Sequence, residues 1–146
     1  MLLIKGYKNN PYGIYRNLYI IKMISEGMEQ SLFLRKEGST PKHKVLDFLI
    51  TAQDFDYSLK DIAGYAEVSY PAMKQLKKSL VQDKWILMTR KVGRAQMYKL
   101  NVQSEKVQKF MNFYWGVINE ELEKTGSKKK VSTEFLSQAV QIQAGS

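Results

Sequence analysis

The chain contains no cysteine and only one histidine among its 146 residues. The lack of cysteine excludes disulfide bonds, thiolate zinc sites and cysteine nucleophiles. The histidine, His43, lies between two lysines at the predicted start of a helix. Surface packing or a phosphate contact is its expected role, because a single imidazole cannot form a histidine-rich metal site. We therefore expect no catalytic residue, no metal site and no cofactor.

Long apolar runs are also missing. The longest apolar stretch near the N-terminus, residues 18–21, is closed by Lys22, which leaves it too short for a signal-peptide core or a membrane span. We expect a chain that does not enter the membrane and stays in the cytosol.

Asp54, Asp56 and Asp61 lie close together in the sequence, but carboxylates at such positions are expected to serve turns and helix caps. The sequence therefore does not predict an enzyme.

Positive charge is abundant. Twenty-three Lys and Arg against fourteen Asp and Glu give a net charge of +9 and a pI near 9.6. Such a balance indicates a polyanionic partner, with nucleic acid ahead of an anionic membrane. A basic surface that serves only solubility is the alternative.

Three helices follow one another between residues 40 and 82. Apolar residues at helical spacing predict a helix over 41–53, capped by Thr40 with a proline in its first turn. Ser58 and Asp61 form a capping-box-like pair that begins a short helix ending near Ala66. Ser69 opens the next helix, which continues to about Gln82. The order is helix, tight turn, helix.

A hairpin and a long helix come next. Residues 85–91 and 96–100 each have the pattern of a strand, and Gly93 between them can adopt the positive φ of a turn. A helix with a wide apolar stripe is predicted from Ser104 to Lys124. Pairing with a second copy of the chain is the expected use of this stripe, through Phe110, Met111, Tyr114, Val117, Ile118 and Leu122.

The predicted organisation has four parts. Residues 1–39 are an N-terminal extension, 40–101 a winged helix-turn-helix, 102–125 a dimerisation helix and 126–146 a C-terminal tail. The first 35 residues mix alternating and helical features, so a small sheet, a helix on the dimer or a partly ordered arm all remain open. The fold class is mainly α with a small β-hairpin wing.

The charge is concentrated on two elements. Residues 70–100 hold eight Lys and Arg and one acid, Asp83, which makes +7 of the total +9. These residues cover the second helix of the helix-turn-helix and the hairpin, the two elements that touch a duplex in this architecture. The predicted DNA-binding residues are Ser69, Tyr70, Lys74, Gln75, Lys77, Lys78, Arg90, Lys91 and Arg94.

Each element has a predicted role on DNA. With Met73, Leu76 and Leu80 inward, the helix presents a polar, basic face of suitable width for the major groove. Gln75 suits an adenine edge and Lys74 a guanine edge, whereas Ser69 and Lys78 suit phosphates. The arginine-bearing hairpin tip is expected on the backbone or in a minor groove.

About 60 residues, from Leu46 to Asn101, resemble the winged helix-turn-helix domains of archaeal transcription regulators, related to the MarR and ArsR groups. The resemblance depends on Ile62, Ala63, Val68, Ser69, Pro71, Met73 and Leu76, on Trp85 and Ile86, and on the segment Val92–Ala95 before Tyr98 and Leu100. It implies DNA binding through the helix 69–82, support from the wing at 85–100, and homodimers on pseudo-palindromic sites. No metal-sensing ligand set of the ArsR kind is present. Many such turns carry glycine where this chain has Glu67, so a left-handed Glu67 would carry a strain of about 1 kcal/mol.

Two functions follow. The first is a dimeric, sequence-specific transcription regulator bound to double-stranded DNA. The second is a winged-helix module for protein interaction or DNA architecture in a transcription, replication or partition assembly, since winged helices also bind proteins. The aromatic-rich N-terminal extension and the apolar helix from Ser104 favour a protein partner.

Overall fold

The computed structural model describes Met23 and residues 25–124 of the chain. Within this part, Gln30–Tyr114 form one compact unit, and the described residues before and after it belong to a second. The predicted C-terminal tail and most of the predicted N-terminal extension lie outside the described residues. The unit Gln30–Tyr114 contains the whole of the predicted 40–101 segment together with residues on both sides of it.

Three helices form the centre of this unit, and the sequence predicted all three. They are α4 (Pro41–Thr51), α5 (Leu59–Tyr65) and α6 (Tyr70–Gln82). The Thr40 hydroxyl accepts from the His43 N–H at 3.2 Å, the Ser58 hydroxyl from Asp61 at 3.1 Å, and the Ser69 hydroxyl from Ala72 at 3.3 Å. Each cap satisfies a backbone donor that has no partner within its helix, which is why the helices begin where they do.

The turn between α5 and α6 brings these two helices together. Glu67, which stands where many such turns carry glycine, has φ 56 and so lies in the left-handed region. Lys84, which follows α6, has φ 60 and was not predicted to be left-handed. The N–H of Val68 donates to the Ala63 carbonyl at 2.9 Å and closes the end of α5. The strained residue, Glu67, therefore lies at the turn where the chain leaves α5 and changes direction toward α6.

We expect Glu67→Gly to stabilise the protein by about 0.5–1 kcal/mol, because glycine adopts positive φ without a steric penalty. Glu120→Gly is the matched control. It places the same substitution in the interior of a helix, at an exposed position, where a loss of about 0.5–1 kcal/mol is expected. Urea unfolding of both variants measures the difference. A loss of stability at Glu67 would contradict the argument from strain.

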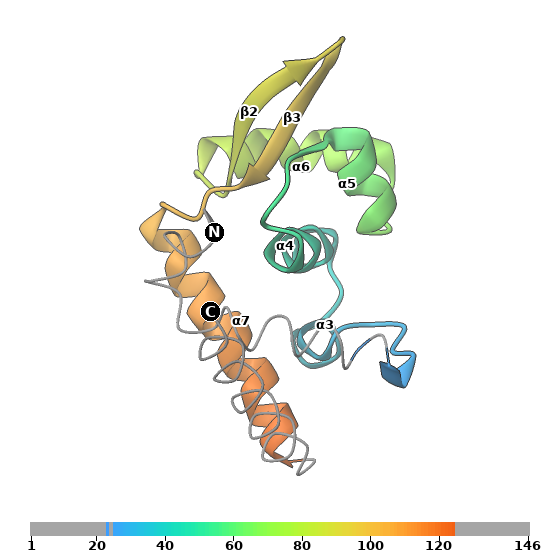
Figure 1. Ribbon diagram of the computed structural model, residues 1–146, viewed down its shortest axis with the longest axis vertical. Helices are drawn as coiled ribbons and strands as arrows, with labels where there is room; N and C mark the ends of the chain where they lie inside the picture. Colours follow the sequence, from blue (N-terminus) through green and yellow to red (C-terminus); the bar gives the residue numbers. More distant parts are fainter. Residues whose placement is uncertain (1–22, 24, 125–146) are drawn as a thin grey trace, which may run out of the picture. The chain divides into compact units, whose positions relative to one another are not determined.

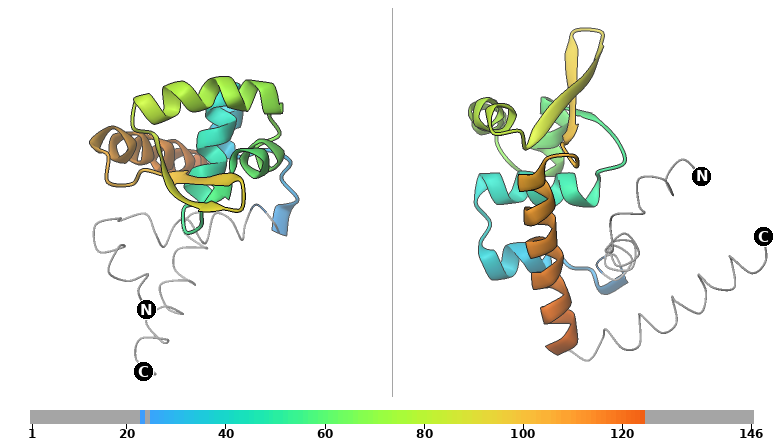
Figure 2. Two further views of the ribbon diagram at one scale, coloured as in Figure 1. Left: turned by 90° about the horizontal axis from the view of Figure 1, so that it is seen from above. Right: turned by 90° about the vertical axis from the view of Figure 1, so that its left-hand side faces the viewer.

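A three-stranded antiparallel sheet in the order β1-β3-β2 packs on the helices. The hairpin consists of β2 (Ile86–Val92) and β3 (Ala95–Leu100), and it extends well beyond the helices (Figures 1 and 2). Val92 pairs with Ala95, so the loop is only two residues long, and Gly93 at its first position has φ 62. This conformation matches the hairpin loops that require glycine there. The third strand, β1 (Tyr57–Ser58), was not predicted.

The hairpin contains a β-bulge. Met88 pairs with Tyr98 and Arg90 pairs with Met97, which leaves Thr89 as an extra residue on β2. Directly paired residues share a face of the sheet, and the face alternates along each strand. Because Thr89 has no partner on β3, the residues of β2 after the bulge lie on the opposite face from the one that regular alternation would give them.

The core lies between these helices and the sheet. Ile62, Met73, Leu80, Ile86 and Leu100 are almost fully buried there. A further helix that was not predicted, α3 (Leu32–Glu37), adds Phe33, whose ring packs edge-on against Phe110 at 5.7 Å and tilted against Tyr114 at 4.7 Å. His43 also packs on Phe33, at 5.4 Å, which agrees with a packing role for the histidine.

The long helix predicted after Ser104 is present as α7 (Glu105–Lys124). Its buried residues are Val107, Tyr114, Trp115 and Ile118. The Tyr114 hydroxyl donates to Asp47 Oδ1 at 2.7 Å, and the Ser31 hydroxyl donates to the same oxygen at 2.6 Å. Asp47 of α4 therefore connects the start of α3 to α7. Among the described helices, none has the length and apolar character needed to cross a membrane.

Candidate nucleic-acid interface

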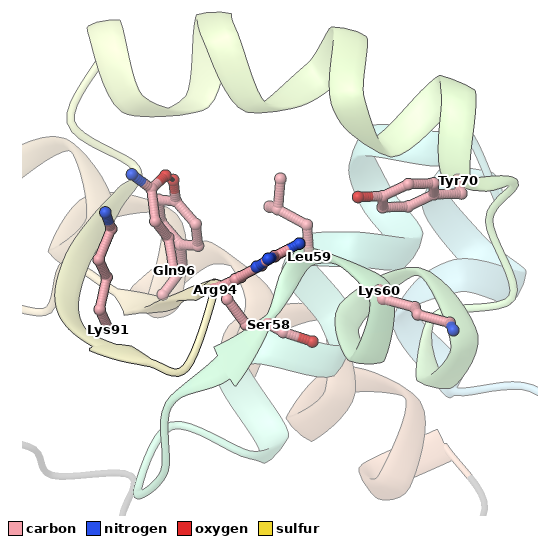
Figure 3. A pocket seen from close by; sticks show the side chains of 9 residues that line it. Ser58, Leu59, Lys60, Tyr70, Lys91, Arg94 and Gln96 are labelled. Atoms are coloured by element: carbon pink, nitrogen blue, oxygen red, sulfur yellow. Dashed lines mark hydrogen bonds between the residues drawn. The ribbon is translucent and has the colours of Figure 1, made fainter.

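A basic hollow of about 510 Å³ lies between the start of α5, the start of α6 and the hairpin. In Figure 3, Tyr70 points into it from α6, Arg94 from the hairpin turn, and Lys60 lies on α5. Its lining comprises Ser58, Leu59, Lys60, Tyr70, Lys91, Arg94, Ala95, Gln96 and Tyr98. Three of these residues are cationic and none is acidic, so the hollow suits an anionic ligand.

The exposed face of α6 borders this hollow. Met73 and Leu80 are fully buried, whereas Lys74, Gln75 and Lys78 are exposed. The burial pattern is the one expected for a helix that packs one side on the core and presents a polar side to solvent. The predicted recognition face is therefore open along most of the helix.

Two lysines of α6 lie over aromatic rings. The Lys74 ammonium lies 4.7 Å from the centre of the Tyr70 ring, and that of Lys77 lies 5.5 Å from the Tyr98 ring. Cation–π contacts of this kind hold a flexible ammonium group near one position. The Tyr98 hydroxyl also donates to Gln96 Oε1 at 2.7 Å. The contact between Lys77 and Tyr98 links α6 to the hairpin.

The hairpin presents different cations on its two faces. Lys91 pairs with Gln96, which lines the hollow, so Lys91 shares this inner face. Arg90 pairs with Met97 and shares the outer face. Arg94, in the turn itself, also lines the hollow. Of the three predicted cations on the hairpin, two therefore face α6 and the third faces away from it.

Arg90 is held by Asp56 on the outer face. Its Nε and Nη2 donate to the two carboxylate oxygens at 2.9 and 3.1 Å, and the Thr89 hydroxyl donates to Oδ2 at 2.6 Å. The hydrogen bonds from Arg90, and next those from Thr89, lower the pKa of Asp56 to about 2. Asp56 comes immediately before β1, so this cluster connects the two edges of the sheet.

No protein-family model matches the chain, and no curated protein matches it in sequence. Solved structures do match. MepR, a transcription regulator of the Staphylococcus aureus multidrug efflux pump MepA, has a TM-score of 0.51 at 17% identity, over 87% of this chain and 96% of MepR. A MepR variant from a multidrug-resistant S. aureus clinical isolate has a TM-score of 0.52 at 16% identity, over 87% and 94%. The chain has a winged-helix fold. A third MepR structure, a variant bound to an oligodeoxyribonucleotide, has a TM-score of 0.50 at 17% identity, over 87% and 95%.

In this winged helix, most of the predicted DNA-binding residues lie on the hollow or beside it. Tyr70, Lys91 and Arg94 line it, and Lys74 and Lys77 contact aromatic rings at its edge. Gln75 and Lys78 are exposed on α6, and Ser69 is its N-cap. Arg90 lies on the opposite face of the hairpin.

Six lining residues of the hollow were not among the predicted DNA-binding residues: Ser58, Leu59, Lys60, Ala95, Gln96 and Tyr98. Lys60 had a usable signal, because it lies in the first turn of α5, and the first helix of a helix-turn-helix crosses the DNA backbone. Gln96 and Tyr98 alternate on β3, but the face that they share depends on the strand pairing.

The predicted dimerisation residues differ in exposure. Tyr114 and Ile118 are buried within the single chain. Phe110, Met111, Val117 and Leu122 are half-buried, and Phe113, which was not predicted, is 50% exposed.

The described part of the chain holds no group of three or more side chains suited to bind a metal ion.

Proposed function

We propose that the chain is a sequence-specific transcription regulator that binds double-stranded DNA. In this proposal α6 enters the major groove, and the hairpin β2–β3, the wing, contacts the backbone or the adjacent minor groove. The observation that carries it is the position of Lys60 on α5 and of Lys91 and Arg94 on the hairpin, which together line one hollow beside the exposed face of α6.

The dimensions of α6 fit this role. A helix with its side chains is about 10–12 Å across, and the major groove of B-DNA is about 12 Å wide. In this arrangement Gln75 and Lys74 would contact base edges, and Lys78 and Ser69 would contact phosphates. The hollow beside the helix would receive the sugar-phosphate strand at the edge of the groove. The same fold serves a transcription regulator in MepR.

We assign Arg90 a different role from Lys91 and Arg94. Its guanidinium group is already engaged by Asp56 and lies on the outer face of the wing. It is therefore expected to hold the wing in place and to make little direct contact with DNA.

Homodimers on pseudo-palindromic sites belong to the same proposal. The half-buried apolar residues of α7 and the exposed Phe113 would form the contact, and an isologous interface places two α6 helices in successive major grooves. Membership of the archaeal branch of such regulators, the absence of enzymatic activity and a cytoplasmic location complete the proposal.

We expect DNA affinity to fall steeply with salt. If Lys60, Lys78, Lys91 and Arg94 each neutralise one phosphate, the log–log slope should be about 3–4 per chain, at about 0.9 per phosphate. Fluorescence anisotropy with a duplex selected from a random library measures it, and a shuffled duplex tests sequence preference. Lys109→Ala, an exposed cation of α7, is the control and should leave the slope unchanged. A flat salt response would contradict the proposal.

A protein-interaction module is the second candidate, because one aromatic cluster lies on the surface. Phe48 and Tyr65 stack at 5.3 Å, and Tyr57 packs edge-on against Phe48 at 5.0 Å. Tyr65 is 66% exposed, and Phe55, in the turn before β1, is 69% exposed. Weak DNA binding without sequence preference, together with a stoichiometric protein complex lost in Tyr65→Ala, would favour this second function.

A further inference from the structure

The bulge at Thr89 determines which cation of the wing faces α6. Between Ile86 and Met88 the even-numbered residues of β2 share the inner face with Tyr98 and Leu100. If regular pairing continued from Met88, Arg90 would pair with Gln96 and would turn toward the hollow. The extra residue instead pairs Lys91 with Gln96 and turns Arg90 outward. Two registers of the same hairpin therefore offer different cations to the same site.

The bulged register has a specific support from outside the hairpin. The Thr89 hydroxyl, which belongs to the extra residue, donates to Asp56 at 2.6 Å, and the fork of Arg90 pairs with both oxygens of that carboxylate. The Asp56 side chain is 16% exposed, whereas that of Arg90 is 63% exposed. Regular pairing would turn Arg90 to the other face of the sheet and would separate it from Asp56.

The turn does not by itself enforce one register. The bulged hairpin has a two-residue loop, Gly93 and Arg94. Regular pairing would place Lys91 opposite Ala95 and leave a three-residue loop, residues 92–94, whose left-handed last position would be Arg94 at a strain of about 1 kcal/mol. The contact with Asp56, which only the bulged register makes, adds to the preference of the turn for that register.

We propose that Asp56 is a positioning residue for DNA binding, which holds the wing in the bulged register so that Lys91, and not Arg90, faces the DNA. The part of the inference that concerns DNA affinity rests on the proposed function, whereas the part that concerns the register of the hairpin does not. Asp56 itself touches no DNA in this arrangement. It acts through Thr89 and Arg90, on the face of the wing opposite to the hollow.

The test is a pair of alanine substitutions made in two backgrounds. In the natural background, Lys91→Ala should lower DNA affinity about eightfold at 0.1 M salt, which is the value of one phosphate contact. Arg90→Ala should have a smaller effect, because Thr89 still holds Asp56 and Arg90 itself makes no contact with DNA. In the Asp56→Ala background the two effects should exchange. The proposal is overturned if the effect of Lys91→Ala changes by less than threefold between the backgrounds, and a larger change supports it.

Two controls separate this effect from general damage. Lys74→Ala on α6 should cost the same in both backgrounds, because no contact with Asp56 places Lys74. Circular dichroism checks that the variants fold, and Asp56→Asn, which keeps the size of the side chain and removes the charge, replaces Asp56→Ala if that variant does not. Thr89→Val should reproduce the exchange in part.

The register is also observable without DNA. Cross-strand nuclear Overhauser contacts should join Lys91 to Gln96 in the natural protein and Arg90 to Gln96 in Asp56→Ala. An unchanged pattern overturns the inference. If neither Lys74→Ala nor Lys91→Ala weakens DNA binding, the proposed function fails, and the Overhauser pattern still decides the register.

Discussion

Replacing Lys91 and Arg94 together by alanine should lower DNA affinity about 60-fold at 0.1 M salt. Each phosphate contact contributes about 0.9 decades of affinity at that salt concentration, and the two cations line the same hollow from the wing. The salt slope should fall by about 1.8 at the same time. Replacing both by glutamate should lower the affinity further, because it adds repulsion from the backbone.

The control for this loss is a double variant with the same change in net charge. Arg35 of α3 and Lys109 of α7 are exposed cations that lie away from the hollow. Arg35→Ala with Lys109→Ala should change the affinity less than threefold. Equal losses in the two double variants would mean that net charge alone, and not the wing, governs binding.

Asp47→Ala should destabilise the protein by about 2–4 kcal/mol, whereas Asp47→Asn should be close to neutral. Asp47 Oδ1 accepts from both Ser31 and Tyr114, and these two residues are buried. Alanine leaves both hydroxyl groups without this acceptor, at a cost of about 1–3 kcal/mol each. An asparagine oxygen at the same place can accept both bonds. Urea unfolding followed by tryptophan fluorescence compares the two variants.

The same carboxyl gives a pH dependence of definite sign. Burial raises the pKa of Asp47 above its ordinary 3.8, although the bonds from Ser31 and Tyr114 act in the opposite direction. The folded protein therefore binds this proton more tightly than the unfolded chain does. The contribution of Asp47 to stability is full below pH 3.8 and is lost as the pH rises through the raised pKa. Asp47→Asn should remove this part of the pH profile, and an unchanged profile would contradict the assignment.

Local signals were enough to predict α4, α5, α6, α7 and the hairpin. Thr40, Ser58 and Ser69 each cap a helix through a residue three positions later, and Gly93 gives the hairpin its turn. Such contacts depend on neighbours in the sequence. The order of the elements, and with it the winged-helix fold, followed from them.

Helix α3 was missed although Ser31 caps it locally, whereas β1 and the position of Arg90 were missed because they depend on distant partners. β1 is two residues long and exists because Tyr57 and Ser58 pair with β3. The outward position of Arg90 depends on a bulge and on Asp56, which is 34 residues away. No alternation of residue types along β2 could indicate it, because one extra residue reverses the faces of all that follow.

The site was predicted only in part, because some of its residues come together only through contacts between distant parts of the chain. The cations of α6 and of the hairpin turn were identified because charge is concentrated there, and the fold brings them to one hollow. Lys60 was missed because it lies outside the charged segment 70–100, on a helix whose start joins the hollow only in three dimensions.

The shared acceptor at Asp47 also sets a lower limit on the size of an independently folding fragment. A peptide of residues 40–101 would keep α4, α5, α6 and the wing, but it would lack Ser31, Phe33 and Tyr114. It would expose the side of α4 that bears Asp47 and the apolar surface that these residues cover. Shortened versions for spectroscopy should therefore retain at least residues 30–114, and those cut closer are expected to aggregate.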